Sequence, residues 1–96
     1  VCQLRPESRG SVHIKSVNPE AYPAIKANYL DTENDRKTIV AAVRRVRDVF
    51  NAPALDKYRG QEINPGAQAQ SDEEILEYVR AEGASVYHPV GTCKMG

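Results

Sequence analysis

The chain has 96 residues, and its 13 lysines and arginines balance its 13 aspartates and glutamates, so that its formal net charge is zero. Such a chain has no overall field that attracts nucleic acid or an anionic membrane, and a dedicated DNA-binding module is disfavoured. A chain of this length buries only somewhat more than ~60% of its unfolded surface, so the core of one small domain is expected to be thin.

Two cysteines and two histidines limit the disulfide and metal chemistry of the chain. Cys2 and Cys93 lie near opposite ends and form neither a disulfide framework nor a zinc motif, and no metal site is expected. Free buried thiols are the simplest interpretation, which fits a reducing compartment. No apolar run approaches the ~20 residues that cross a bilayer and no signal-peptide pattern is present, so the chain is expected to be soluble.

The first thirty residues predict a small antiparallel sheet. Residues 1–4 alternate and form a candidate strand, and residues 11–16 alternate polar and apolar side chains with a period of two. In the second run the apolar side chains are expected to face the core, whereas His13 faces solvent and has no catalytic role. Residues 24–30 form another extended piece, whose last two side chains are expected to be buried. The second and third runs could pair as a hairpin with a long loop.

The longest predicted element is a helix that follows the hairpin. Residues 31–35 supply an oxygen-bearing cap and acidic side chains for the first turn, which favour a helix N-terminus. Apolar residues then recur at helical spacing as far as Phe50, so one stripe is expected to pack on the sheet. Arg44, Arg45 and Arg47 could form a phosphate or nucleic-acid patch, but a solvated charged face is commoner and is favoured here.

A second helix is predicted at about residues 72–82. Ser71 as the cap and Glu74 three residues later form a capping box, and Gly83 is the expected stop. The stretch between the two helices is irregular, and Tyr58 is one of its expected anchors. These elements together predict an α+β fold, in which helices pack on a small antiparallel sheet.

The residues of greatest chemical interest lie in the last dozen positions, around His88. Pro89 removes a backbone donor and biases His88 towards an extended conformation, so the ring is presented from a stiff segment, and Gly91 permits a tight bend. Imidazole is the side chain best suited to proton exchange near neutral pH. Taken alone, a histidine beside a proline is more often a hydrogen-bonded structural residue than a catalyst. A Cys93 nucleophile activated by His88 lacks a visible third group that would orient it.

Four segments in the same order resemble one protein family. The string HPVGTCKMG at residues 88–96 is similar to the C-terminal active-site signature of the glucose-methanol-choline (GMC) oxidoreductases, flavoproteins that oxidise alcohols with FAD. The string LRPESRG at residues 4–10 resembles the start of that family's C-terminal domain. The strings NYL at residues 28–30 and LDKYRG at residues 55–60 are similar to segments of its choline-dehydrogenase-like branch.

The resemblance implies a role for the chain within a larger enzyme. Residues 1–96 would be part of the C-terminal substrate-binding domain, truncated at both ends, of an FAD-dependent alcohol or choline dehydrogenase or oxidase. His88 would accept the hydroxyl proton of the alcohol while hydride passes to the flavin, with Val86 and Tyr87 close to substrate or cofactor. The family's second active-site residue would lie beyond Gly96.

The flavin itself is not expected to be held by this chain. Nothing in the sequence matches the Gly-rich turn of a dinucleotide-binding fold, so FAD would be bound mainly by a preceding N-terminal portion, and the isolated chain is expected to be inactive. The rival interpretation is a stand-alone interaction module with no catalytic role. In either case exposed sheet edges would favour self-association. The expected location is cytoplasmic, compatible with a full-length enzyme peripheral to the inner face of the membrane.

Overall fold

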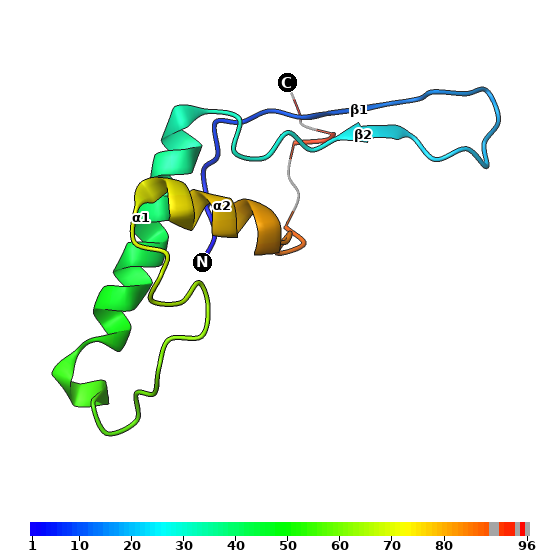
Figure 1. Ribbon diagram of the computed structural model, residues 1–96. Helices are drawn as coiled ribbons and strands as arrows, with labels where there is room; N and C mark the ends of the chain where they lie inside the picture. Colours follow the sequence, from blue (N-terminus) through cyan, green and yellow to red (C-terminus); the bar gives the residue numbers. More distant parts are fainter. Residues whose placement is uncertain (89–90, 94, 96) are drawn as a thin grey trace.

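The computed structural model describes residues 1–88, 91–93 and 95. A two-stranded antiparallel sheet is followed by two helices, which confirms the predicted α+β class (Figure 1). The elements in chain order are β1 (Ser11–His13), β2 (Ala24–Lys26), α1 (Glu33–Phe50), the short 3₁₀ helix η1 (Pro53–Leu55) and α2 (Asp72–Glu82). The radius of gyration is 17.7 Å, whereas a compact domain of this size has one of about 13 Å. The chain is therefore elongated, with the hairpin projecting away from the helices.

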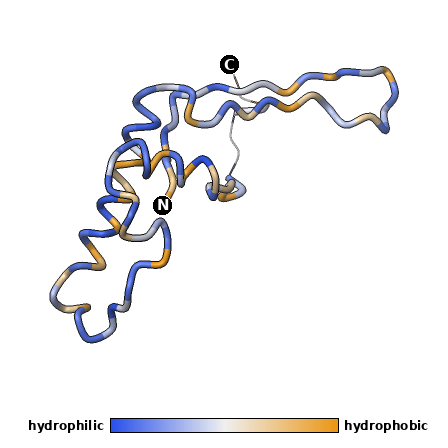
Figure 2. The backbone as a smooth tube through the Cα atoms, viewed as in Figure 1, coloured by the Kyte–Doolittle hydropathy of each residue, from blue (hydrophilic) through white to orange (hydrophobic). Residues whose placement is uncertain are grey.

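The hairpin pairs as predicted, but it is shorter and more exposed than predicted. Val12 lies opposite Ile25 in the antiparallel register, and no residue of β1 or β2 is buried. The apolar side chains of this region were expected to face a core, yet Ile14 is 89% exposed and Tyr29 is 73% exposed. Both expectations are wrong because the two helices pack against each other rather than against the strands. Figure 2 shows hydrophobic residues at several points along the projecting hairpin.

Gly10 allows the chain to enter the hairpin. A Cβ atom at this position would lie 2.2 Å from the carbonyl oxygen of Lys26 and 2.6 Å from that of Ala27. These are backbone atoms of β2 and of the residue that follows it, and they cannot move aside as a flexible side chain could, so only glycine fits there. Residues 1–4, a candidate strand by alternation, are irregular in the structure, and this prediction is wrong.

Helix α1 packs on α2 and not on the sheet, which corrects the predicted packing. Val40, Ala69 and Ile75 form the buried core, and they come from α1, the connecting loop and α2. The core is thin, as the chain length predicts. Phe50 lies at the end of α1 and is exposed, as are Cys2 and Cys93, which were expected to be buried.

The ends of both helices follow their sequence signals. In α1 the cap is Thr32, whose hydroxyl accepts a hydrogen bond from the Asp35 amide at 3.2 Å. In α2 the predicted capping box is present, with the Glu74 amide donating to Ser71 Oγ at 3.1 Å and the Ser71 amide donating to Glu74 Oε2 at 2.9 Å. The backbone N–H of Ser71 lowers the pKa of Glu74. Gly83 ends the helix, as predicted.

Neither described helix combines the length and apolar character that a membrane-spanning helix needs. Among the described residues no group of three or more His, Cys, Asp and Glu side chains is arranged to hold a metal ion.

Candidate active site

The three candidate residues lie in an exposed segment that leaves the C-terminal end of α2 (Figure 1). Val86, Tyr87 and His88 are all exposed, Val86 at 50% and Tyr87 at 86%. The backbone is not simply extended here, because Tyr87 has a φ of 59° and its amide donates to Ser85 Oγ at 3.0 Å. The chain therefore turns immediately before the candidate base.

The predicted tight bend at Gly91 is consistent with its φ of 87°, a value that suits glycine. The stiffening effect predicted for Pro89 concerns residues outside the described part of the chain. His88 is exposed, and within residues 1–88, 91–93 and 95 no ion pair or side-chain hydrogen bond engages its ring. The assignment of His88 as proton acceptor stays a prediction.

The most strongly perturbed carboxyl group lies elsewhere, at the start of α1, and the sequence interpretation missed it. Asp35 is 2% exposed and accepts hydrogen bonds from the amides of Glu7 at 2.9 Å and Ser8 at 2.7 Å, and from Ser8 Oγ at 2.5 Å. The Ser8 hydroxyl in turn accepts from the amides of Asp31 and Thr32. The Ser8 hydroxyl bond, opposed by burial and assisted by the two amides, lowers the pKa of Asp35 from 3.8 to about 2.

This network has a structural role rather than a catalytic one. It joins residues 7 and 8, inside the segment that resembles the start of the GMC C-terminal domain, to the first turn of α1. The signal in the sequence is the spacing of Thr32 and Asp35, which resembles that of a capping box and places a carboxylate at the helix N-terminus. The partners of that carboxylate lie 27 and 28 residues away, so spacing alone does not reveal them.

Arg47 is not on a solvated face, which corrects the prediction for this residue. Its side chain is 16% exposed and binds Glu62 through both Nε and Nη2, with the shortest contact, Nη2 to Oε1, at 2.8 Å. Nη2 also donates to the Gly66 carbonyl at 3.1 Å. The guanidinium lowers the pKa of Glu62, against the opposing effect of burial. The pair fixes the irregular loop to α1, whereas Tyr58 in that loop is exposed and is not the expected anchor.

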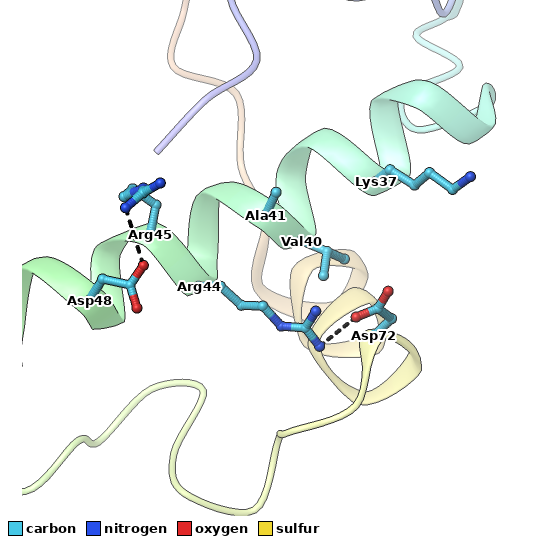
Figure 3. Close-up of a pocket in the computed structure, with 7 residues that line it drawn as sticks. All are labelled: Lys37, Val40, Ala41, Arg44, Arg45, Asp48 and Asp72. Atoms are coloured by element: carbon cyan, nitrogen blue, oxygen red, sulfur yellow. Dashed lines mark ion pairs between the residues drawn. The ribbon is translucent and has the colours of Figure 1, made fainter.

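A shallow depression of about 400 Å³ lies between α1 and the start of α2 (Figure 3). Arg44 pairs with Asp72 at 2.5 Å and donates to the Gln70 carbonyl, and Arg45 pairs with Asp48 at 3.4 Å. Both arginines along this wall already have carboxylate partners, so the depression is not the phosphate patch considered from the sequence. None of the three candidate residues lines it.

The described residues do not fit FAD by themselves. The depression in Figure 3 carries the carboxylates of Asp48 and Asp72, and a second one, of about 430 Å³, carries those of Glu74 and Glu77. In the first depression Lys37, Arg44 and Arg45 are each paired with a carboxylate. The lining of the second has carboxylates and no lysine or arginine. Neither depression therefore presents an unpaired cation to the cofactor's diphosphate. The exposed His88 lines neither of these two depressions.

Comparisons with known proteins agree with the resemblance. A model of the GMC oxidoreductase family matches residues 6–96. Over all 96 residues the chain is 50% identical to an oxygen-dependent choline dehydrogenase of Klebsiella pneumoniae, 49% to one of Citrobacter koseri and 47% to one of Escherichia coli O127:H6. In each case the matched region covers 100% of this chain and 17% of the relative.

The matched residues include the α+β scaffold and the segment that carries His88. The chain belongs to the GMC oxidoreductase family, as part of its C-terminal domain and close to proteins named choline dehydrogenases. It spans 17% of the length of the curated relatives it matches.

Proposed function

We propose that this chain is part of an FAD-dependent oxidoreductase that acts on the CH–OH group of choline or another primary alcohol. The observation that supports this most strongly is the identity of 47–50%, over every residue of the chain, to proteins named oxygen-dependent choline dehydrogenase. The matched stretch includes the segment that carries His88. The conclusion for the whole protein is a proposal, since the chain spans a minor part of those relatives.

In this proposal His88 takes the hydroxyl proton of the alcohol onto a ring nitrogen. When bound, the flavin would supply the hydride acceptor that side chains lack, so that loss of the hydroxyl proton to His88 and of hydride from the α-carbon would convert a primary alcohol to an aldehyde. The exposure of His88 and Tyr87 is consistent with this role, because a base must lie within hydrogen-bond reach of the proton it removes. Val86 and Tyr87 would lie beside the substrate or the flavin.

The substrate is tested on the full-length enzyme with a panel of choline, a simple aliphatic primary alcohol and a polyol. Each alcohol is added without oxygen, and the absorption of the bound flavin is followed. We expect choline or another primary alcohol to bleach the flavin, with turnover when oxygen or an artificial electron acceptor is supplied. A full-length enzyme that binds FAD and is reduced by none of these alcohols would contradict the proposal.

The isolated 96-residue chain is expected to elute from gel filtration without flavin and at more than a monomer mass. It should lack flavin because neither described depression presents an unpaired cation to the cofactor's diphosphate. It should associate because both hairpin edges and their apolar side chains are exposed. Absorption at flavin wavelengths and light scattering measure the two quantities on one column. Flavin that co-elutes with the chain would show that the dinucleotide is held here after all.

The exposed hairpin is the observation that favours the second candidate, a stand-alone interaction module. Its apolar residues Ile14, Val17 and Tyr22 are available for a partner. The alcohol panel discriminates between the two proposals, because an interaction module has no alcohol-dependent step. Within the enzyme proposal the same surface would contact the FAD-binding portion.

A further inference from the structure

The backbone at Tyr87 is unusual for its residue type. A φ of 59° is the left-handed conformation, which brings Cβ close to a carbonyl oxygen and is rarely adopted by aromatic residues. Such residues are concentrated at sites where function requires a particular geometry. Tyr87 immediately precedes the candidate base, so its backbone angles set the direction in which the chain continues to His88.

The other two non-glycine residues with positive φ in the described chain are held by the fold itself. Asn28 donates through Nδ2 to the Arg9 carbonyl at 2.9 Å, and the Leu30 carbonyl accepts from Arg36 Nη1 at 2.9 Å. Asparagine also tolerates this conformation better than most residues. These two angles therefore have a structural explanation in the connection from β2 to α1.

Tyr87 has no comparable explanation from packing. Its ring is exposed, so burial does not hold the residue in the left-handed conformation. The hydrogen bond that accompanies the turn is local, from the Tyr87 amide to Ser85 Oγ at 3.0 Å. The serine hydroxyl is thus the one side-chain group of the described residues that is bonded to the backbone of this turn.

We propose that Ser85 and the left-handed backbone of Tyr87 are positioning residues that aim the His88 imidazole at the hydroxyl group of the alcohol. This inference rests on the proposed function, in which His88 accepts the proton. A turn one residue before the base controls the ring position, and a misplacement of about 1 Å can cost about 10²-fold in rate. The tyrosine contributes through its backbone, independently of any contact its ring makes.

Two matched substitutions of Tyr87 in the full-length enzyme separate the backbone from the ring. Tyr87→Asn and Tyr87→Thr both remove the ring, but asparagine tolerates a left-handed backbone and the β-branched threonine resists it. We expect kcat of Tyr87→Asn to exceed that of Tyr87→Thr by about tenfold, with equal flavin content and equal Tm. Equal values of kcat for the two variants would overturn the proposal.

The hydroxyl group is tested with Ser85→Ala and its conservative counterpart Ser85→Thr. We expect Ser85→Ala to lower kcat by about tenfold with KM nearly unchanged, and Ser85→Thr to restore most of the loss. Wild-type turnover in Ser85→Ala would contradict a positioning role.

A double-mutant cycle distinguishes positioning from general damage. If Ser85 acts through His88, Ser85→Ala should have no further effect on the residual turnover of an enzyme that already carries His88→Ala. A further loss would show that Ser85 acts on the structure and not through the imidazole. His88→Ala with full turnover would instead refute the proton-acceptor assignment, whereas an inactive His88→Ala with a fully active Ser85→Ala would refute the positioning proposal alone.

Discussion

His88→Ala in the full-length enzyme is expected to lower kcat by about two to four orders of magnitude, the range for loss of a positioned proton acceptor. FAD should stay bound, because His88 lines neither described depression and the cofactor's binding groups are proposed to lie outside this chain. The variant should therefore lose turnover while it keeps its FAD. Steady-state turnover with a saturating alcohol, together with the flavin absorbance of the purified variant, measures both.

The matched control for this prediction is His13→Ala. His13 is exposed on β1, opposite Ala24 in the antiparallel register, and it is the only other histidine of the chain. Its replacement should leave kcat almost unchanged. Near-normal turnover in His88→Ala, under conditions in which chemistry is shown to limit the rate, would remove His88 from the role of base.

Elements specified by local signals were predicted well. The capping box at Ser71 and Glu74 and the stop at Gly83 gave the bounds of α2, because every group involved lies within a few residues along the chain. The pairing of β1 with β2 also followed from alternation. Burial was predicted poorly, since alternation shows which side chains share a face but not whether another element covers that face. Ile14, for example, was predicted to face the core from alternation alone, and it is exposed.

Polar contacts between residues far apart in the chain were not predicted from the sequence. Arg47 was assigned to solvent, yet its partner Glu62 lies 15 residues away in an irregular loop. A helical pattern cannot reveal such a partner. At the candidate site, His88 was singled out by its Pro89 and Gly91 context and was assigned as the base by family resemblance. The turn at Tyr87 was not predicted, because proline restricts only the residue directly before it. Position 88 is restricted by that rule, and position 87 is not.

The strongest effect on stability is expected at Asp35, through Asp35→Asn. The carboxylate accepts from three donors at Glu7 and Ser8, whereas an asparagine offers one oxygen and directs an NH₂ group at donors that then lack a partner. The shift of the pKa of Asp35 from 3.8 to about 2 corresponds to about 2 kcal/mol in favour of the folded state. Local opening of the segment that holds residues 7 and 8 should become easier by about that amount.

Amide hydrogen exchange at Glu7 and Ser8 in the full-length enzyme measures this opening. Near neutral pH we expect their protection factors to fall by about 30-fold in Asp35→Asn. Because the folded pKa lies below the unfolded one, the contribution of the wild-type carboxylate is complete above pH 3.8 and is lost as the pH falls towards about 2. The wild type should lose protection over that interval, and the variant should show no such step.

Asp48→Asn is the control on the same helix. Asp48 is exposed, and among the described residues its one ion pair is with the exposed Arg45, at 3.4 Å, so its replacement should change the free energy of opening by less than about 0.5 kcal/mol. Unchanged protection at Glu7 and Ser8 in Asp35→Asn would mean that the buried carboxylate does not tie this segment to α1. The hydrogen bonds of Ser8 Oγ to the amides of Asp31 and Thr32 would then have to hold it.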